Sequence, residues 1–149
     1  MEAVPYDTLT DEQLLALCIW REARGETFDA KFAVGCSVRN RVLRPSWWGY
    51  DWHTVILKKW QYSSFNPGDP NEKKWPEDED PSWKDSVACA QRTIEIAPDT
   101  TNGATNYYDT SIHFPSGWGP IGEWTNTLNI GRLKFWKHVT PEFSVEDLD

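Results

Sequence analysis

The chain has 149 residues, of which 39% are hydrophobic, so it is long enough to form one domain around a real core. Its formal net charge is −8 and it has no run of basic residues. We therefore expect no nucleic-acid partner, because phosphate binding depends on clustered Lys and Arg. Ten tryptophans are too many for all to be fully buried, so we expect several to line a groove, where flat rings suit sugar faces or partner surfaces.

The expected location of the chain follows from its cysteines and its first residues. The cysteines are odd in number and lie within helical apolar patterns, so we expect buried free thiols and synthesis in a reducing compartment: Cys18, Cys36 and Cys89. Residues 1–5 have no basic region and no apolar run, so we expect no export signal. No segment approaches the length needed to span a membrane, and we expect no membrane partner.

A first helix is predicted over residues 11–23. Thr10 can serve as its N-cap, and Gln13 three residues later completes a capping box. Gly25 lets the backbone turn after the helix.

A second helix is predicted over residues 29–43 and ends before Pro45. Its arginines Arg39, Arg41 and Arg44 are expected to lie toward water. A short helix over residues 54–59 follows, and then a long loop over residues 60–80. Loops of this length in a compact domain are more often functional than idle.

A third long helix begins at Pro81, with Asp80 as its N-cap, and is expected to continue to Pro98. Residues 105–108 predict a short strand, and residues 128–139 predict one terminal strand. The acidic tail after about residue 140 is expected to fray. We therefore expect a single domain over residues 1–149, mostly helical with a few short strands, of the α+β class.

Two carboxylates, Glu22 and Glu26, lie at or just past the end of the first helix. There they face the negative pole of the helix dipole, which disfavours ionisation and raises a carboxyl pKa. A raised pKa suits a general acid working near neutral pH. The alternative interpretation is a solvated charged helix end, in which these glutamates pair weakly with Arg21 and Arg24.

Other catalytic chemistries lack their sequence signals. The three histidines have no paired-ligand spacing, so we expect no metal site: His53, His113 and His138. No serine has a nucleophile-elbow sequence and no glycine-rich phosphate loop is present, so we expect no cofactor. An acid at a helix end facing an aromatic cleft is the outline of a glycoside-cleaving enzyme.

Several short motifs follow one another along nearly the whole chain. They are W-R-E-A-R-G-E at residues 20–26, A-V-G at 33–35, V-R-N-R-V at 38–42, Q-Y-S at 61–63, G-A-T-N-Y-Y at 103–108 and I-G-R-L-K-F at 130–135. In this order they resemble the SleB-type cell-wall hydrolases, a family that includes spore-cortex-lytic enzymes and related phage endolysins. The tryptophan-rich loop at residues 47–52 departs from that pattern.

The resemblance implies a lysozyme-like fold that cleaves the β-1,4 bond between N-acetylmuramic acid and N-acetylglucosamine in peptidoglycan, as a lytic transglycosylase. It implies Glu22 as the acid and base, with Glu26 as the competing candidate that otherwise orients a neighbour. The candidates for positioning the sugar and the glutamate are Gln61, Tyr62, Ser63, Asn106, Tyr107 and Tyr108.

Two alternatives remain open. A hydrolase that activates water needs a second carboxylate, for which the chain offers Asp69, Asp109 and Glu123. A non-catalytic carbohydrate- or wall-binding module would use the same aromatic groove. On the leading interpretation the partner is a peptidoglycan glycan strand, the protein is a monomer, and a phage endolysin would leave the cytoplasm by holin-type release.

Overall fold

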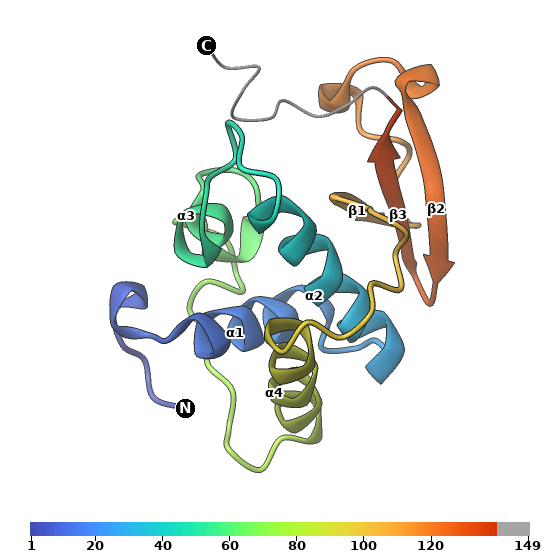
Figure 1. Ribbon diagram of the computed structural model, residues 1–149. Coiled ribbons are helices and arrows are strands. Elements are labelled where there is room, and N and C mark those ends of the chain that lie inside the picture. Colours follow the sequence, from blue (N-terminus) through green and yellow to red (C-terminus); the bar gives the residue numbers. More distant parts are fainter. Residues whose placement is uncertain (140–149) are drawn as a thin grey trace.

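The computed structural model describes residues 1–139 and has a helical body with a small sheet on one side (Figure 1). Its helices are α1 (Asp11–Ala23), α2 (Phe28–Val42), α3 (Trp52–Leu57) and α4 (Pro81–Ile94). Helices α1, α2 and α4 pack on one another, and α3 contacts α1 and α2. Short 3-10 helices occur at Tyr6–Thr8, Ser63–Phe65, Ser116–Trp118 and Ile121–Glu123.

The sheet has three antiparallel strands in the order β1-β3-β2. They are β1 (Asn106–Asp109), β2 (Trp124–Ile130) and β3 (Leu133–His138). The central strand β3 buries Leu133 and Phe135 in the same core as the helices. The expected α+β class is therefore confirmed.

Helix α1 has the bounds that the sequence predicts. Its capping box forms, because the Gln13 N–H donates to Thr10 Oγ1 over 3.1 Å and the Thr10 N–H donates to Gln13 Oε1 over 2.9 Å. The helix buries Leu14, Leu17 and Ile19 completely. The helix thus lies in the core, and its last turn carries the candidate catalytic glutamate, Glu22.

Helix α2 lies within one residue of its predicted bounds, but the expected exposure of its arginines is wrong for two of them. Arg39 and Arg41 are buried, and only Arg44 is exposed. The Arg39 guanidinium donates to the Thr93 carbonyl, and Arg41 donates to the Thr105 carbonyl. Backbone carbonyls outside α2 thus satisfy donors that the sequence pattern assigned to water.

The predicted single strand over residues 128–139 is wrong, because this segment belongs to a hairpin. Gly131 has φ +56° and turns the chain between β2 and β3, where a residue without Cβ is favoured. Strand β2 begins at Trp124, within a stretch of exposed polar residues that carries little apolar signal.

Smaller corrections concern the other ends. Helix α3 begins at Trp52, capped by Asp51, rather than at residue 54. Helix α4 begins at Pro81 as expected but ends at Ile94, and Ile96 just beyond it has φ +64°. The first strand is one residue later than predicted.

The remaining expectations fall on the cysteines, on membrane spans and on the tail. All three cysteines are buried and free, as expected. Within residues 1–139, no helix combines the length and the apolar character that crossing a bilayer requires. The acidic tail lies outside the described residues.

Candidate active site

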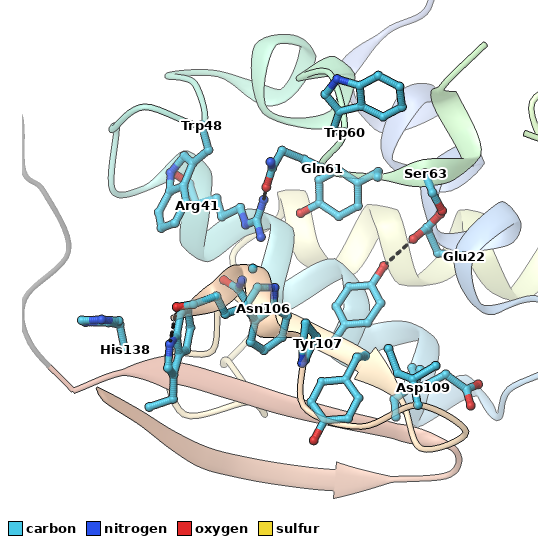
Figure 2. Close-up of a pocket in the computed structure, with 18 of the residues that line it drawn as sticks. Glu22, Arg41, Trp48, Trp60, Gln61, Ser63, Asn106, Tyr107, Asp109 and His138 are labelled. Carbon is cyan, nitrogen blue, oxygen red and sulfur yellow. Dashed lines mark hydrogen bonds between the residues drawn. The ribbon is translucent and has the colours of Figure 1, made fainter. Parts of the chain in front are cut away.

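A pocket of about 1010 Å³ lies where the end of α1, the loop after α3 and strand β1 meet (Figure 2). All predicted site residues except Glu26 line it: Glu22, Gln61, Tyr62, Ser63, Asn106, Tyr107 and Tyr108. Glu22 and Tyr107 are 85 residues apart in the sequence, so distant segments converge on one cavity.

Glu22 is held in this pocket by two hydrogen bonds from different elements. The Tyr107 hydroxyl on β1 donates to Oε1 over 2.9 Å, and the Ser64 backbone N–H donates to Oε2 over 3.4 Å. Figure 2 shows the Tyr107 hydroxyl pointing at the carboxyl of Glu22. Both carboxyl oxygens thus have a donor, which fixes the orientation of the group.

The pKa of the Glu22 carboxyl is raised above its ordinary value. Burial is the main cause, and the nearby negative charge of Asp69 adds to it, while the contacts with Ser64 and Tyr107 act in the opposite direction. The sequence predicts this direction from the helix dipole, whereas the structure shows burial as its main cause. A carboxyl group that keeps its proton to higher pH suits a general acid.

Glu26 does not line the pocket. Its Oε1 accepts the backbone N–H of Arg132 over 3.1 Å, and its Oε2 occupies the space that a Cβ at Gly131 would fill, at the β2–β3 turn. Glu26 therefore links the turn after α1 to the β2–β3 hairpin. Of the two glutamates in the E-A-R-G-E motif, Glu22 lines the pocket and Glu26 does not.

Arg21 is also not part of a solvated helix end, because its side chain is buried. Its guanidinium donates to the backbone carbonyls of Ser64, Glu72 and Lys74 and to the Tyr6 hydroxyl. Adjacent residues of α1 thus hold Ser64 at both ends, since Arg21 binds its carbonyl and Glu22 accepts its N–H. The long loop is therefore fixed to helix α1 at the point where it contacts Glu22.

The sequence motif predicts Ser63 as a site residue, but the residue that contacts Glu22 is its neighbour Ser64. Ser63 is exposed at the pocket, whereas Ser64 is buried and contacts Glu22. Their adjacency in the motif carries no signal of which one points inward, because the 3-10 helix Ser63–Phe65 decides it. Tyr62 is buried beside them, and burial raises the pKa of its phenol well above the ordinary value.

Several further pocket residues were not predicted individually. They are Arg41, His138 and the tryptophans Trp47, Trp48, Trp60, Trp118 and Trp124. The tryptophan content predicts a lined groove, but only the fold shows which rings form it. Trp118 and Trp124 pack together with ring centroids 5.0 Å apart.

The candidate second carboxylates differ in position. Asp109 lines the pocket, and its carboxylate accepts the Ser111 N–H over 2.8 Å and lies 3.5 Å from an Arg132 nitrogen. These hydrogen bonds lower its pKa. Asp69 and Glu123 are not among the lining residues.

Within residues 1–139, no three His, Cys, Asp or Glu side chains gather closely enough to hold a metal ion.

This chain matches one family model and resembles two solved structures. A family model described as cell wall hydrolase matches residues 25–136, so Glu22 lies just before the matched region. The catalytic domain of the Bacillus cereus SleB protein superposes with a TM-score of 0.65 and 22% identity over 85% of this chain and 89% of that chain.

A second solved structure, the catalytic domain of the germination-specific lytic transglycosylase SleB from Bacillus anthracis, gives the same TM-score and identity. It covers 90% of this chain and 100% of that chain. At 22% identity these two likenesses show the fold. A search of curated proteins found no match.

Proposed function

This chain belongs to the cell wall hydrolase family, and we propose that it cleaves the β-1,4 bond between N-acetylmuramic acid and N-acetylglucosamine in peptidoglycan. The observation that carries the proposal is Glu22, a carboxyl group with a raised pKa inside an aromatic-lined pocket. Cleavage of a glycosidic bond needs a carboxyl group that can protonate the glycosidic oxygen, and aromatic rings beside it can hold the sugar faces.

The proposed reaction is that of a lytic transglycosylase with one acid and base. Glu22 donates its proton to the glycosidic oxygen as the bond to the muramic C1 breaks, and the substrate's own N-acetyl group stabilises the cationic carbon. The Glu22 carboxylate then takes the proton of the muramic C6 hydroxyl, whose oxygen bonds to C1 and closes a 1,6-anhydro ring. The glutamate ends protonated, as it began.

Tyr107 and Ser64 support both halves of this cycle. Their hydrogen bonds to the two carboxyl oxygens stabilise the carboxylate that forms after proton donation. Burial acts the other way and favours the protonated form of the resting acid. We propose that Gln61, Ser63, Asn106 and Tyr108 contact the sugars, since they line the same pocket.

A muramidase that uses water is a second candidate, because Asp109 is a further carboxylate in the pocket. Its lowered pKa keeps it ionised, as a base or nucleophile requires. The product distinguishes the two reactions, since a transglycosylase leaves 1,6-anhydromuramic ends and a muramidase leaves reducing ends.

The test is loss of turbidity of purified peptidoglycan, with the products identified by mass spectrometry. We expect the wild type to clear the suspension and release anhydro ends. We expect Glu22→Gln to lower kcat by about 10²–10⁴-fold, the usual share of a general acid. Glu26→Gln is the matched control, because that glutamate lies outside the pocket, and we expect it to keep its activity.

Two other results would change the proposal. Activity lost in Glu26→Gln but kept in Glu22→Gln would assign the acid to the other glutamate. Binding of the wild type to several walls without cleavage would favour a non-catalytic wall-binding module.

A further inference from the structure

Arg41 places a buried positive charge on the wall of the pocket. Its side chain is 5% exposed, and none of the ion pairs formed within residues 1–139 involves it. Burying a charge without a counter-ion is costly unless something else compensates for it. A cation kept in this state at a pocket needs a reason beyond packing.

The guanidinium is held firmly by neutral groups. Its Nε donates to the Thr105 carbonyl over 2.7 Å, and its Nη1 donates to Gln61 Oε1 over 3.1 Å. The rings of Trp48 and Tyr62 lie 5.0 and 5.3 Å from its central carbon. The group is therefore fixed in place before any ligand binds, which lowers the entropic cost of binding.

Arg41 still has donors to offer. Two of its five N–H groups have the partners named above, and its Nη2 makes no hydrogen bond within the described part of the chain. Arg21 is equally buried but donates to four acceptors and does not line the pocket. Of these two buried arginines, Arg41 is the one with unused donors at the pocket.

Figure 2 shows the Arg41 guanidinium between Gln61 and Asn106, on the side of the pocket away from Glu22. A ligand group there would therefore be a substituent of the bound chain rather than the bond that is cleaved. A planar guanidinium with free N–H groups matches a carboxylate, which it can bind through two parallel hydrogen bonds.

We propose that Arg41, with Gln61 beside it, forms a subsite for a carboxylate of the substrate. The inference rests on the proposed function, because peptidoglycan carries such groups beside the glycan backbone. One source is the lactyl group of N-acetylmuramic acid in strands without peptides. The other is a free carboxyl group of the stem peptide. The net charge of −8 repels anions at long range, so a local cation is needed to hold them.

The experiment measures binding without cleavage, in a Glu22→Gln background. Peptide-free glycan strands are compared before and after methyl esterification of their lactyl carboxylates. Peptide-bearing strands are compared before and after amidation of their carboxyl groups. We expect dissociation constants at least about tenfold lower for the charged form in one pair, and that pair identifies the source of the carboxylate.

Matched variants at Gln61 test whether Arg41 is responsible. Gln61→Glu places a carboxylate beside the guanidinium and supplies a counter-ion within the protein, so the preference for charged strands should disappear. Gln61→Met has a similar size and leaves the cation unpaired, so the preference should remain. Thermal melting confirms that both variants are folded.

Equal binding of the charged and neutral forms in both pairs would overturn the subsite, and so would a preference that persists in Gln61→Glu. Failure of the proposed function is read separately. If the wild type fails to cleave peptidoglycan while the Glu22→Gln variant still prefers charged strands, the proposed cleavage activity is contradicted and the Arg41 subsite is not. A cleaving wild type without that preference contradicts the subsite alone.

Discussion

The Tyr107 hydroxyl donates a hydrogen bond of 2.9 Å to Oε1 of Glu22 and so joins strand β1 to the last turn of helix α1. Burial and the charge of Glu22 raise the pKa of the Tyr107 phenol well above its ordinary value. The phenol therefore remains a neutral donor at any pH at which the enzyme would work. It favours the carboxylate form of Glu22, against the larger effect of burial.

Removing that donor should raise the pKa of Glu22 further. In Tyr107→Phe the carboxylate loses a hydrogen bond to a charged group, worth about 1.5–3 kcal/mol. We expect the alkaline limb of the kcat–pH profile, where the acid loses its proton, to move to higher pH. We also expect kcat to fall at low pH, because the carboxylate that forms during the reaction is less stable.

The control is Tyr108→Phe, which removes a neighbouring pocket hydroxyl that makes no hydrogen bond to Glu22 within the described chain. Its profile should keep the wild-type alkaline limb. An unchanged limb in Tyr107→Phe would show that this contact does not control the acid.

The raised pKa of Glu22 also predicts how stability depends on pH. Unfolding lets the group ionise at its ordinary pKa, so between that value and the higher folded value the folded state binds more protons. Stability then falls as the pH rises through this window. We expect Glu22→Gln to be more stable than the wild type at pH 7, and the difference to vanish below about pH 4, where both states are protonated.

Thermal melting of the wild type and Glu22→Gln from about pH 3 to pH 7 measures this difference. Glu26→Gln serves as the control for charge removal, because Glu26 accepts a backbone hydrogen bond instead of lying in the pocket. A Glu22→Gln variant that is less stable than the wild type at pH 7 would contradict the assignment of burial as the main cause.

Much of the site could be predicted from the sequence because its signals are local. The capping box of Thr10 and Gln13 fixes the start of α1, and the glycine at residue 25 limits its end, so Glu22 lies in the last turn. The order of the motifs predicts Tyr62 and Tyr107 as site residues, and both line the pocket.

The rest depends on contacts between distant segments, which local patterns do not carry. Arg41 is expected to lie toward water, and one interpretation places Arg21 at a solvated helix end, but carbonyls of distant segments accept hydrogen bonds from both side chains. The hairpin is not apparent from the sequence, because a single glycine, Gly131, separates two segments that read as one apolar strand. Its partner Glu26 is 105 residues away in number and gave no sign of that contact.

The contact between Glu26 and Gly131 gives a prediction about stability. A Cβ at residue 131 would overlap Glu26 Oε2, and φ there is +56°, which costs a non-glycine residue about 1–2 kcal/mol. We therefore expect Gly131→Ala to lower the free energy of unfolding by more than that backbone cost alone. Glu26→Ala should cost about 1 kcal/mol through the lost hydrogen bond to Arg132.

A double-mutant cycle in urea separates the two effects. In the double variant the overlap is relieved, so the combined loss should be smaller than the sum of the single losses. Additive losses would mean that the added methyl group does not meet the Glu26 side chain.

Trp60 combines an unfavourable backbone with an exposed ring at the pocket. It has φ +71°, which is uncommon for a bulky residue, and its side chain is 70% exposed. The backbone N–H of Trp60 donates to Asn66 Oδ1 over 3.1 Å, and this hydrogen bond helps to hold the backbone conformation. Strained residues of this kind cluster at binding sites, so we expect the ring to stack on a sugar of the glycan strand.

Trp60→Gly should therefore affect binding more than folding. Relief of the positive φ offsets the backbone entropy of glycine, so we expect the free energy of unfolding to change by less than about 1 kcal/mol. We expect KM for glycan strands to rise roughly 3–10-fold with kcat nearly unchanged, because stacking away from the cleaved bond stabilises substrate and transition state alike. Tyr50→Gly is the matched control, because this tyrosine is 69% exposed but does not line the pocket. An equal rise in KM in both variants, or none in Trp60→Gly, would rule out a specific role for the Trp60 ring.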